Sequence, residues 1–507
     1  MPMRPPRLTS PRPKARRTIA SVHDYKYSLR LSRPVLYNID YMLEKLLLDN
    51  PKILLRNARV LDVERGVLTD PVHVLCENGT IRDVDCADTR DAAVLDLQGL
   101  TLSPGLIDCH VHILSPYMTE QKGVPGLWTF KQMDRNCIAT VAAGVVCVCD
   151  MLSPIKILNR QKRKILSGAV AGPEIIASGG IFSCEGGYPE AVHPVPPLVG
   201  ALVGQPKYEP KTPQEAARMV EYLYHQGARI IKVGYTRLSR MLVDGRTLPA
   251  IADDVLHGLC RAAHRYGLTV RVHHNWSEDM HHLLTFDIDA LEHGVYDRDL
   301  LDDEIEKVRD SGVTVCPTLT INDSQARFEE KIGFLQSERA KEFFEQPALD
   351  NLRFVCSTWT DFSAADYSGS FGYTRANRYC YAAEERNTAN LLQAGVPMVA
   401  GTDIGAVVAW PGELADELLR LESIGMSKLE AIRAATSRAA EFVARPDLGM
   451  VKPGRTASFT VIEGNPLEDL RAYRKVRYTC VRGGWFKTLH ESLPDFWPGH
   501  EVLFSLD

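Results

Sequence analysis

Eight short apolar runs recur through the middle of this chain, and each is followed by a segment with helical periodicity. The runs cover residues 106–113, 145–151, 174–180, 229–235, 269–275, 290–294, 314–320 and 396–403. Alternating buried strands and helices are typical of a parallel sheet flanked by helices, and eight such units are what a closed barrel requires. We therefore predict an α/β fold with a (β/α)8 TIM barrel over residues 101–444. About 75 residues separate the last two runs, which predicts an excursion near the active-site face.

Short runs typical of strands flank this barrel on both sides. Residues 53–62 and 71–86 precede it, with Asn78-Gly79 as a strong hairpin signal, and residues 457–465 and 476–487 follow it. Segments on either side of a central domain can pair with each other. We expect residues 51–100 and 445–507 to form one small composite β-sandwich domain.

The first 50 residues are predicted to be a basic N-terminal extension, disordered in part. Residues 1–20 hold five prolines, six basic residues and no acid, so they cannot bury enough apolar area to fold alone. Apolar residues at helical spacing predict a short helix over residues 37–48. A mitochondrial presequence is also basic and poor in acids, but the prolines disfavour its amphipathic helix. We expect a cytoplasmic protein, with mitochondrial targeting as the alternative.

Composition excludes several classes of partner. The formal net charge of −5 over 507 residues comes without a long basic stripe, and no apolar run approaches the length of a membrane span. The 12 cysteines are scattered and mostly lie in apolar runs, which indicates free buried thiols in a reducing compartment. We expect a soluble homo-oligomer that acts on a small molecule, with no nucleic-acid or membrane partner.

Polar residues interrupt five of the apolar runs, each at or near the end where the strand should finish. They are His110, His112, Lys232, His273, His293 and Asp403. Taken singly, a histidine on an apolar strand is more often a hydrogen-bonded core residue. Together they favour a site, because catalytic groups of such barrels gather at the carboxyl ends of several strands.

Lys232 has the least ordinary position of the six. An ammonium inside a barrel loses its hydration, and without a partner it should release its proton. The neutral amine can react with carbon dioxide, and the resulting carbamate has two anionic oxygens that can bridge two cations. The alternative is an ion pair between Lys232 and a carboxylate such as Asp403.

Imidazole nitrogens and carboxylate oxygens suit divalent metals. We expect two such ions, with zinc as the first choice, although manganese, iron and cobalt accept the same ligands. Two cations about 3.5 to 4 Å apart activate water and polarise a carbonyl. Asp403 is then placed to take a proton from that water and deliver it to a departing amine. This combination predicts a hydrolase.

At these residues the chain resembles the amidohydrolase superfamily, in its imidazolonepropionase-related and metal-dependent dipeptidase branch, which includes enzymes that hydrolyse ochratoxin. The similarity covers residues 53–487, and its markers are SPGLIDCHVHI, GARIIKV, VRVHH, LEHG, GTDIG, GMSKLEAIRAATSRAAE and KPGRTASFTVIEGNPLEDL. The resemblance implies a binuclear site in which His110, His112 and Asp403 hold one metal, His273 and His293 hold the other, and carbamylated Lys232 bridges them.

Several positions depart from the family pattern. Asn275 stands where members often carry a second histidine, and we keep His273 as the ligand because His274 should face the other way. GYTR at 234–237 replaces small residues and a Gly-Gly pair, and GGY at 186–188 replaces a Gly-His-Gly loop. Ser458 replaces an aspartate in a change that we expect to be harmless. The identity of the substrate therefore does not transfer.

Candidate substrate contacts lie in loops just beyond strand ends. They are Tyr188, His193, Tyr235, Arg237 and Trp410. Ordinary loop packing is the alternative for each. Arg237 would suit a substrate carboxylate through its bidentate fork, which points to an N-acyl amino acid or a dipeptide-like amide.

The leading functional prediction is metal-dependent hydrolysis of an amide or related C–N bond. The same metals can serve decarboxylation or the hydrolysis of lactones, esters or phosphoesters. A third reading is a non-catalytic assembly protein that has lost its ligands, but every expected ligand remains in this sequence.

Overall fold

The computed structural model describes residues 43–46, 50–86, 91–114, 128–189, 192–237, 247–326, 328–360, 370–405 and 408–489. Contacts between residues divide the chain into two compact units, Met1–Leu36 and Tyr37–Asp507, and all described residues belong to the second. The predicted basic arm at residues 1–20 lies outside the described residues.

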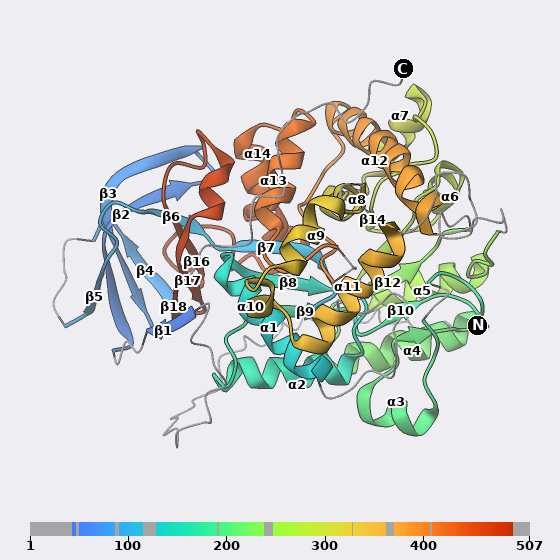
Figure 1. The fold of residues 1–507 in the computed structure, drawn as a ribbon, viewed down its shortest axis with the longest axis horizontal. Helices are drawn as coiled ribbons and strands as arrows, with labels where there is room; N and C mark the ends of the chain where they lie inside the picture. Colours follow the sequence, from blue (N-terminus) through green and yellow to red (C-terminus); the bar gives the residue numbers. More distant parts are fainter. Residues whose placement is uncertain are drawn as a thin grey trace, which may run out of the picture. The chain divides into compact units, whose positions relative to one another are not determined.

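A nine-stranded sheet draws its strands from both flanks of the chain, and its blue and dark red strands lie together at the left of Figure 1. Its order is β1-β18-β17-β16-β6-β2-β3-β4, with β5 beside β2. The strands are β1 (Leu43–Leu46), β2 (Lys52–Asp62), β3 (Val67–Glu77), β4 (Thr80–Val84), β5 (Ala93–Asp96), β6 (Thr101–Pro104), β16 (Phe459–Ile462), β17 (Val476–Val481) and β18 (Gly484–Thr488). The antiparallel pairing of β6 with β16 joins the two flanks.

The hairpin predicted at Asn78-Gly79 is confirmed. Both residues have positive φ, 52° and 72°, and they connect the antiparallel strands β3 and β4. Such a turn suits glycine, and a Cβ at Gly79 would also lie 2.9 Å from the carbonyl oxygen of Arg482.

The helix predicted over residues 37–48 is wrong at residues 43–46. These residues form β1, which pairs antiparallel with β18 from Leu43 opposite Thr488 to Leu46 opposite Trp485. The edge of β18 offers backbone hydrogen bonds to a neighbour, and this tertiary pairing overrides a weak local preference for helix.

Two parallel sheets form the second part of the fold, and they confirm the predicted α/β class. One joins β7 (Leu106–Val111), β8 (Val145–Asp150) and β9 (Glu174–Ala177). The other has the order β11-β10-β12-β13-β14-β15, with β10 (Ile181–Phe182), β11 (Lys207–Tyr208), β12 (Ile230–Gly234), β13 (Thr269–His273), β14 (Ala290–Glu292) and β15 (Thr314–Cys316). Seven of the eight predicted runs therefore contain a strand.

The eighth run, residues 396–403, contains an isolated bridge rather than a regular strand, and a second bridge follows directly at Ile404. Met398 bridges Val315 of β15, and Ile404 bridges Val111 of β7, both in parallel. This segment consequently links the last strand of one parallel sheet to the first strand of the other.

Helices follow the parallel strands along the chain (Figure 1). They are α1 (Trp128–Ala142), α2 (Ile155–Leu166), α3 (Pro197–Val203), α4 (Pro213–His225), α5 (Asp253–Arg265), α6 (Ser277–Leu283), α7 (Asp302–Ser311), α8 (Leu319–Ala326), α9 (Phe328–Gln336), α10 (Ala340–Phe343), α11 (Gln346–Thr360), α12 (Ser370–Gln393), α13 (Leu414–Ser423), α14 (Lys428–Ala434) and α15 (Ser437–Phe442), with a 3-10 helix at Leu470–Arg474. None of the described helices is long and apolar enough to cross a membrane.

The run predicted as a strand over 314–320 is shorter than expected. β15 ends at Cys316, and α8 begins at Leu319. The buried carboxylate of Glu417 accepts hydrogen bonds from the backbone N–H groups of Leu319 and Thr320, at 3.1 and 2.8 Å. Free N–H groups at a helix start need such an acceptor, so a residue on α13 sets where this helix begins.

Apolar side chains form buried clusters in both parts of the described structure. One cluster joins the parallel strands to their helices and includes Val148, Leu259 and Leu418. A second lies on the nine-stranded sheet and includes Phe459 and Trp485. None of the 12 cysteines, all of them described, forms a disulfide, and all but the half-buried Cys184 are buried, as the sequence predicts.

Candidate metal centre

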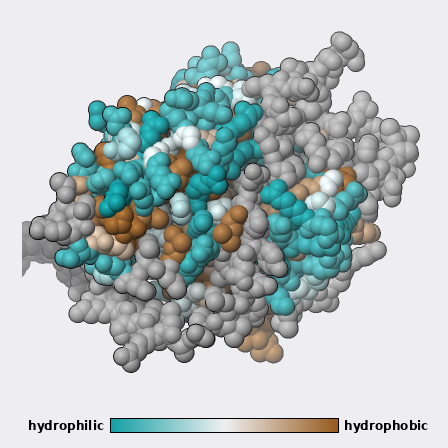
Figure 2. Space-filling model, turned by 60° about the vertical axis from the view of Figure 1, so that its left-hand side comes forward, coloured by the Kyte–Doolittle hydropathy of each residue, from teal (hydrophilic) through white to brown (hydrophobic). Residues whose placement is uncertain are grey.

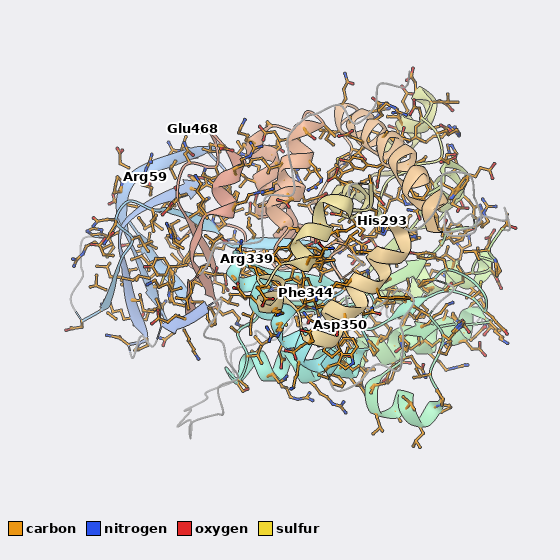
Figure 3. All side chains as sticks on the ribbon, in the orientation of Figure 1. Arg59, His293, Arg339, Phe344, Asp350 and Glu468 are labelled. Atoms are coloured by element: carbon orange, nitrogen blue, oxygen red, sulfur yellow. The ribbon has the colours of Figure 1, made fainter. Side chains whose placement is uncertain are left out.

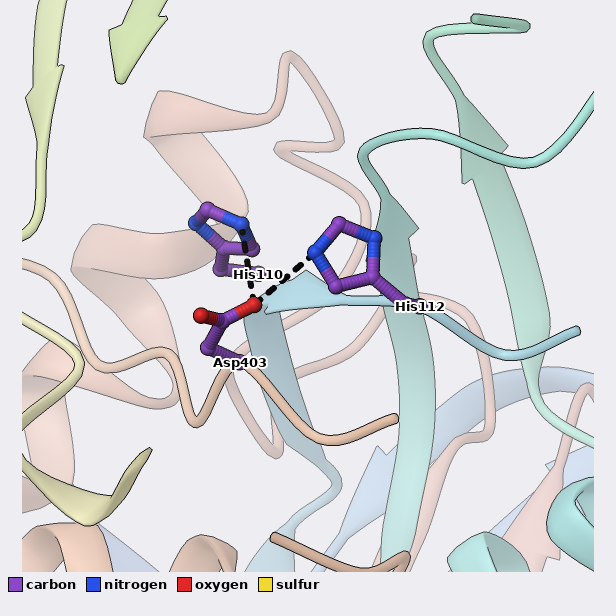
Figure 4. A group of neighbouring side chains, drawn as sticks. All are labelled: His110, His112 and Asp403. Atoms are coloured by element: carbon purple, nitrogen blue, oxygen red, sulfur yellow. Dashed lines mark ion pairs between the residues drawn. The ribbon is translucent and has the colours of Figure 1, made fainter. Parts of the chain in front are cut away.

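His110 and His112 leave β7 on the same side and meet Asp403, the last residue of the eighth run (Figure 4). The Nε2 atoms of His112 and His110 lie 2.9 and 3.4 Å from Asp403 Oδ1. One donor atom from each of the three residues lies within 4.8 Å of the others. Two imidazoles and a carboxylate at this spacing form a candidate cation site.

Backbone and side-chain hydrogen bonds fix this arrangement. Asp403 N donates to His110 O at 2.8 Å, and His112 N donates to Ile404 O at 2.7 Å. Thr402 Oγ1 donates to the buried Asp108 at 2.6 Å. Asp403 adopts a left-handed backbone with φ 55°. Strained conformations of this kind persist where the surroundings over-determine them, and they cluster at functional sites.

Two further histidines extend the cluster. His293 follows β14 (Figure 3), and its ring centroid lies 4.9 Å from that of His110 and 4.5 Å from that of His273 at the end of β13. His293 also has a positive φ of 70°, and its Nδ1 lies 2.7 Å from Thr318 Oγ1. The structure thus brings His273 and His293 beside the first group.

Lys232 on β12 is 2% exposed, and its Nζ has no hydrogen-bond partner among the described residues, Asp403 included. Burial lowers the pKa of Lys232 to about 8, although the charges of Glu292 and Asp403 act to raise it. A neutral amine is therefore accessible near physiological pH.

The donor set fits divalent cations. Burial lowers the pKa of His110 to about 4 and holds the pKa values of His273 and His293 well below their usual range, so these imidazoles keep a lone pair. His273 Nε2 and Lys232 Nζ are buried without hydrogen-bond partners in the described part of the chain. Buried polar atoms are normally paired, and these orphaned atoms are accounted for if they bind ions or, for Lys232, a carbamate.

Glu292 and Arg271 form a buried ion pair under the site that the sequence analysis missed. The other carboxylate oxygen of Glu292 lies 2.5 Å from His110 Nδ1, which leaves His110 Nε2 facing Asp403. Arg271 Nη2 donates to Cys109 O at 2.6 Å. The available signal was a pair of opposite charges inside two apolar runs, because a charge there needs a partner.

Tyr188 and Tyr235 are the predicted substrate contacts that the structure places beside the histidines. The Tyr188 ring stacks on His273, with centroids 4.0 Å apart and planes inclined by 13°. Tyr235 is buried, and its backbone N–H donates to His273 O at 3.0 Å. Tyr188 can therefore shape the space around the second pair of histidines, whereas the Tyr235 ring lies beside His282 on α6, with centroids 6.0 Å apart.

The other three predicted contacts have different surroundings. Arg237 binds the buried carboxylate of Asp279 through its Nε at 2.5 Å and its backbone N–H at 2.8 Å. His193 is exposed. Trp410 is buried in an apolar cluster with Phe334 and has the ammonium of Lys331 over its ring at 4.9 Å.

Known proteins share sequence with this chain. An uncharacterized protein of Mycobacterium tuberculosis is 30% identical over 205 residues, which cover 40% of this chain and 45% of that protein. The chain thus spans less than half the length of the first curated relatives that it matches. Ochratoxinase of Aspergillus niger is 24% identical over 394 residues, which cover 74% of this chain and 72% of that enzyme.

Solved structures share its fold. A Xaa-Pro dipeptidase with bound methionine in its active site has a TM-score of 0.66 at 20% identity, over 86% of this chain and all of that one. Molinate hydrolase has a TM-score of 0.64 at 19% identity, over 87% and 95% of the two chains. These likenesses indicate a TIM-barrel-type α/β fold. The model of the amidohydrolase family matches residues 101–486, most of the chain, and this protein therefore belongs to that family.

Proposed function

We propose that this chain is a binuclear metal-dependent amidohydrolase that cleaves an amide or related C–N bond of a small-molecule or dipeptide-like substrate. The observation that carries the proposal is the buried Lys232 Nζ, which has no hydrogen-bond partner within the described ranges. It lies on the strand next to that of His273, in a fold where His110, His112 and Asp403 already converge. Family membership and hydrolases among the structural neighbours support the same reaction class.

Each ligand has an assigned place in this proposal. His110, His112 and Asp403 would hold one cation, and His273 and His293 would hold the other. Carbamylated Lys232 would bind both cations. Zinc is proposed because imidazole and carboxylate ligands suit it. When bound, the two cations supply an activated water and a Lewis acid for the substrate carbonyl.

The residues around the cations would position and move protons. Although burial raises it, His110 and His112 hold the pKa of Asp403 below its usual value, so this carboxylate is an ionised acceptor. Asp403 would take a proton at a carboxylate oxygen and pass it to the nitrogen of the departing amine. Glu292 would keep the proton of neutral His110 on Nδ1, so that Nε2 stays free to bind.

Substrate contacts are proposed on the same face. Tyr188 would line the site beside His273. Tyr235 is a weaker proposal, because its ring lies beside His282 on α6. Arg237 would meet a substrate carboxylate with the part of its guanidinium that Asp279 does not occupy. His193 and Trp410 are weaker proposals, because His193 is exposed and Trp410 is packed in an apolar cluster. A dipeptide, the substrate class in the name of the similar Xaa-Pro dipeptidase, carries such a carboxylate.

The architecture belongs to the proposal as well. The parallel strands would close into one (β/α)8 barrel over residues 101–444, with residues 51–100 and 445–507 as a composite β-sandwich and residues 1–50 as an extension. The backbone hydrogen bond from Arg229 N to Ala177 O, 2.9 Å, supports closure between β9 and β12.

A homo-oligomer is also proposed, in the cytoplasm and without nucleic-acid or membrane partners. Figure 2 shows hydrophobic residues in small separate groups among the hydrophilic ones on the face that it draws. On α3, however, Leu198, Val199 and Leu202 are exposed by 78%, 43% and 61%. Clustered exposed apolar side chains favour contact with another protein surface.

The test is a product screen on zinc-loaded full-length enzyme. N-acyl amino acids, dipeptides and aryl amides are offered, and products are identified by mass, with the Asp403→Asn variant as the matched control. Release of an amine with uptake of one water, lost in the variant, supports the proposal. Loss of carbon dioxide, or cleavage of esters and lactones alone, assigns the site to another reaction, and no turnover of any class by metal-replete protein contradicts an enzyme.

A further inference from the structure

Lys207 on β11 is a second buried lysine, and its ammonium, unlike that of Lys232, forms hydrogen bonds and an ion pair with described residues. Its residue is 1% exposed, and its Nζ donates to the carbonyl oxygens of Gly187 at 2.7 Å and Pro189 at 3.3 Å. Glu209 lies 3.4 Å away and supplies the counter-charge. A buried ammonium is tolerated only with such partners, so the interaction fixes the backbone on both sides of Tyr188.

The backbone at Tyr188 also packs tightly against the end of β12. A Cβ added to Gly234 would lie 2.5 Å from the carbonyl oxygen of Tyr188. Gly234 pairs with His273 across β12 and β13. Only glycine lets the Tyr188 backbone approach this closely, next to the histidine on which the Tyr188 ring stacks.

His273 is held from two directions. The Tyr188 ring lies nearly parallel to the imidazole on one face, with planes inclined by 13°, and the His293 ring meets it edge-on, with centroids 4.5 Å apart. Its Nε2 has no hydrogen-bond partner among the described residues. The two ring contacts fix the plane of the imidazole, so the orientation that His273 offers to a ligand depends on the Tyr188 stack.

We propose that Lys207 is a positioning residue that clamps the Gly187–Pro189 turn and so keeps Tyr188 stacked on His273. Lys207 touches neither metal nor substrate, and it acts through Tyr188. The part of this inference that concerns metal rests on the proposed role of His273, whereas the clamp itself does not.

Hydrogen–deuterium exchange of the full-length, metal-free protein tests the clamp alone. Lys207→Met keeps much of the side-chain volume and removes the donor, so peptides that cover residues 183–189 should exchange faster than in the wild type. Lys307→Met is the matched control, because Lys307 is an exposed lysine on α7 whose ion pair is with Asp303 of the same helix. Unchanged exchange in a folded Lys207→Met protein overturns the clamp.

Cobalt titration of the same proteins tests the effect on His273. Partners that orient a metal ligand contribute about 10- to 100-fold to metal affinity, so Tyr188→Leu and Lys207→Met should each weaken one of two cobalt sites about 10-fold. Tyr188→Phe keeps the ring and should match the wild type. If Tyr188→Leu binds cobalt as the wild type does, the positioning role is wrong. Wild-type protein that binds no cobalt contradicts the proposed function instead, and the exchange result still decides the clamp.

Discussion

His110 Nδ1 lies 2.5 Å from Glu292 Oε2, and the buried Glu292 also pairs with Arg271. Histidine ligands commonly donate their second ring N–H to a carboxylate, which fixes their tautomer and orientation. Glu292→Gln should weaken metal binding about 10- to 100-fold. It should also destabilise the metal-free protein by about 3–5 kcal/mol, because Arg271 is left as an uncompensated buried charge.

Metal titration and urea unfolding measure these two effects of Glu292→Gln. Glu468→Gln is the control, because Glu468 is exposed. Unchanged metal affinity in Glu292→Gln would show that Glu292 does not orient His110.

Lys232→Ala should lose metal and turnover together. The buried Nζ is the atom that would become the bridging carbamate, and alanine offers no oxygen ligand. A short carboxylic acid added to the variant should restore part of both, because it supplies two anionic oxygens at the same place. The exposed Lys307→Ala is the control. Metal content equal to that of the wild type in Lys232→Ala would count against the bridge.

Asp403→Asn should lower kcat more than substrate affinity. The amide keeps an oxygen that can contact a cation but cannot accept and pass on a proton, and general acid–base groups contribute typically about 10²- to 10⁴-fold. Steady-state kinetics with metal content measured in parallel separates this effect from metal loss. Turnover within twofold of the exposed control Asp310→Asn would refute the proton-transfer role.

The sequence pattern predicted some elements of this structure correctly and others wrongly. The two-residue period of a strand is enough to place His110 and His112 on one side, and turn chemistry is enough to place the hairpin at Asn78-Gly79. Helical spacing over residues 37–48 gave a wrong prediction for residues 43–46, because these residues pair with β18 as a strand. Propensity cannot register a partner that lies more than 400 residues away along the chain.

The residues that support the site could not be predicted from the sequence, for a related reason. Glu292, Arg271 and Lys207 act through contacts between distant strands and loops, and no local spacing signals those contacts. Trp410 illustrates the opposite difficulty. It lies in a loop beyond a strand end, as a substrate contact would, yet it packs with Phe334 and under Lys331, because the long excursion after β15 folds over that loop.

Lys331 and Glu413 form a buried ion pair that joins α9, in the long excursion after β15, to the residue before α13. The Lys331 ammonium lies 2.7 Å from Glu413, and it also donates to the carbonyl oxygen of Val408. Burial lowers the pKa of Lys331 and raises that of Glu413. Lys331→Met should reduce the free energy of unfolding in urea by about 3–5 kcal/mol, because it leaves a buried carboxylate alone.

Adding Glu413→Leu to that variant should recover much of the loss, since two apolar side chains can replace a buried ion pair. A double variant that is less stable than Lys331→Met by the full effect of Glu413→Leu alone would mean that the two residues do not interact.

His264 should make stability depend on pH. Its two ring nitrogens lie 2.9 Å from Asp287 and 2.9 Å from Asp289, an arrangement that requires the imidazolium. Partial burial lowers the pKa of His264, but the two carboxylates outweigh it and raise the pKa above its usual value. The stabilisation is therefore complete below the unfolded pKa, about 6.5, and is lost as the pH rises through the folded one.

Urea unfolding between pH 6 and 9 measures this contribution. The wild type should lose more stability than His264→Gln across that range, by less than about 1 kcal/mol because Asp287 is largely exposed. Parallel profiles for the two proteins would show that the imidazolium contributes nothing.

The proposed amidohydrolase function depends on two cations joined by Lys232. Anomalous diffraction at the zinc edge, from crystals of the wild-type protein grown with zinc and bicarbonate, tests it directly. The expected map has two peaks, one among His110, His112 and Asp403 and one beside His273 and His293, with density extending beyond Lys232 Nζ to both. A map without peaks at these residues, in which Lys232 ends as a bare amine, would contradict it.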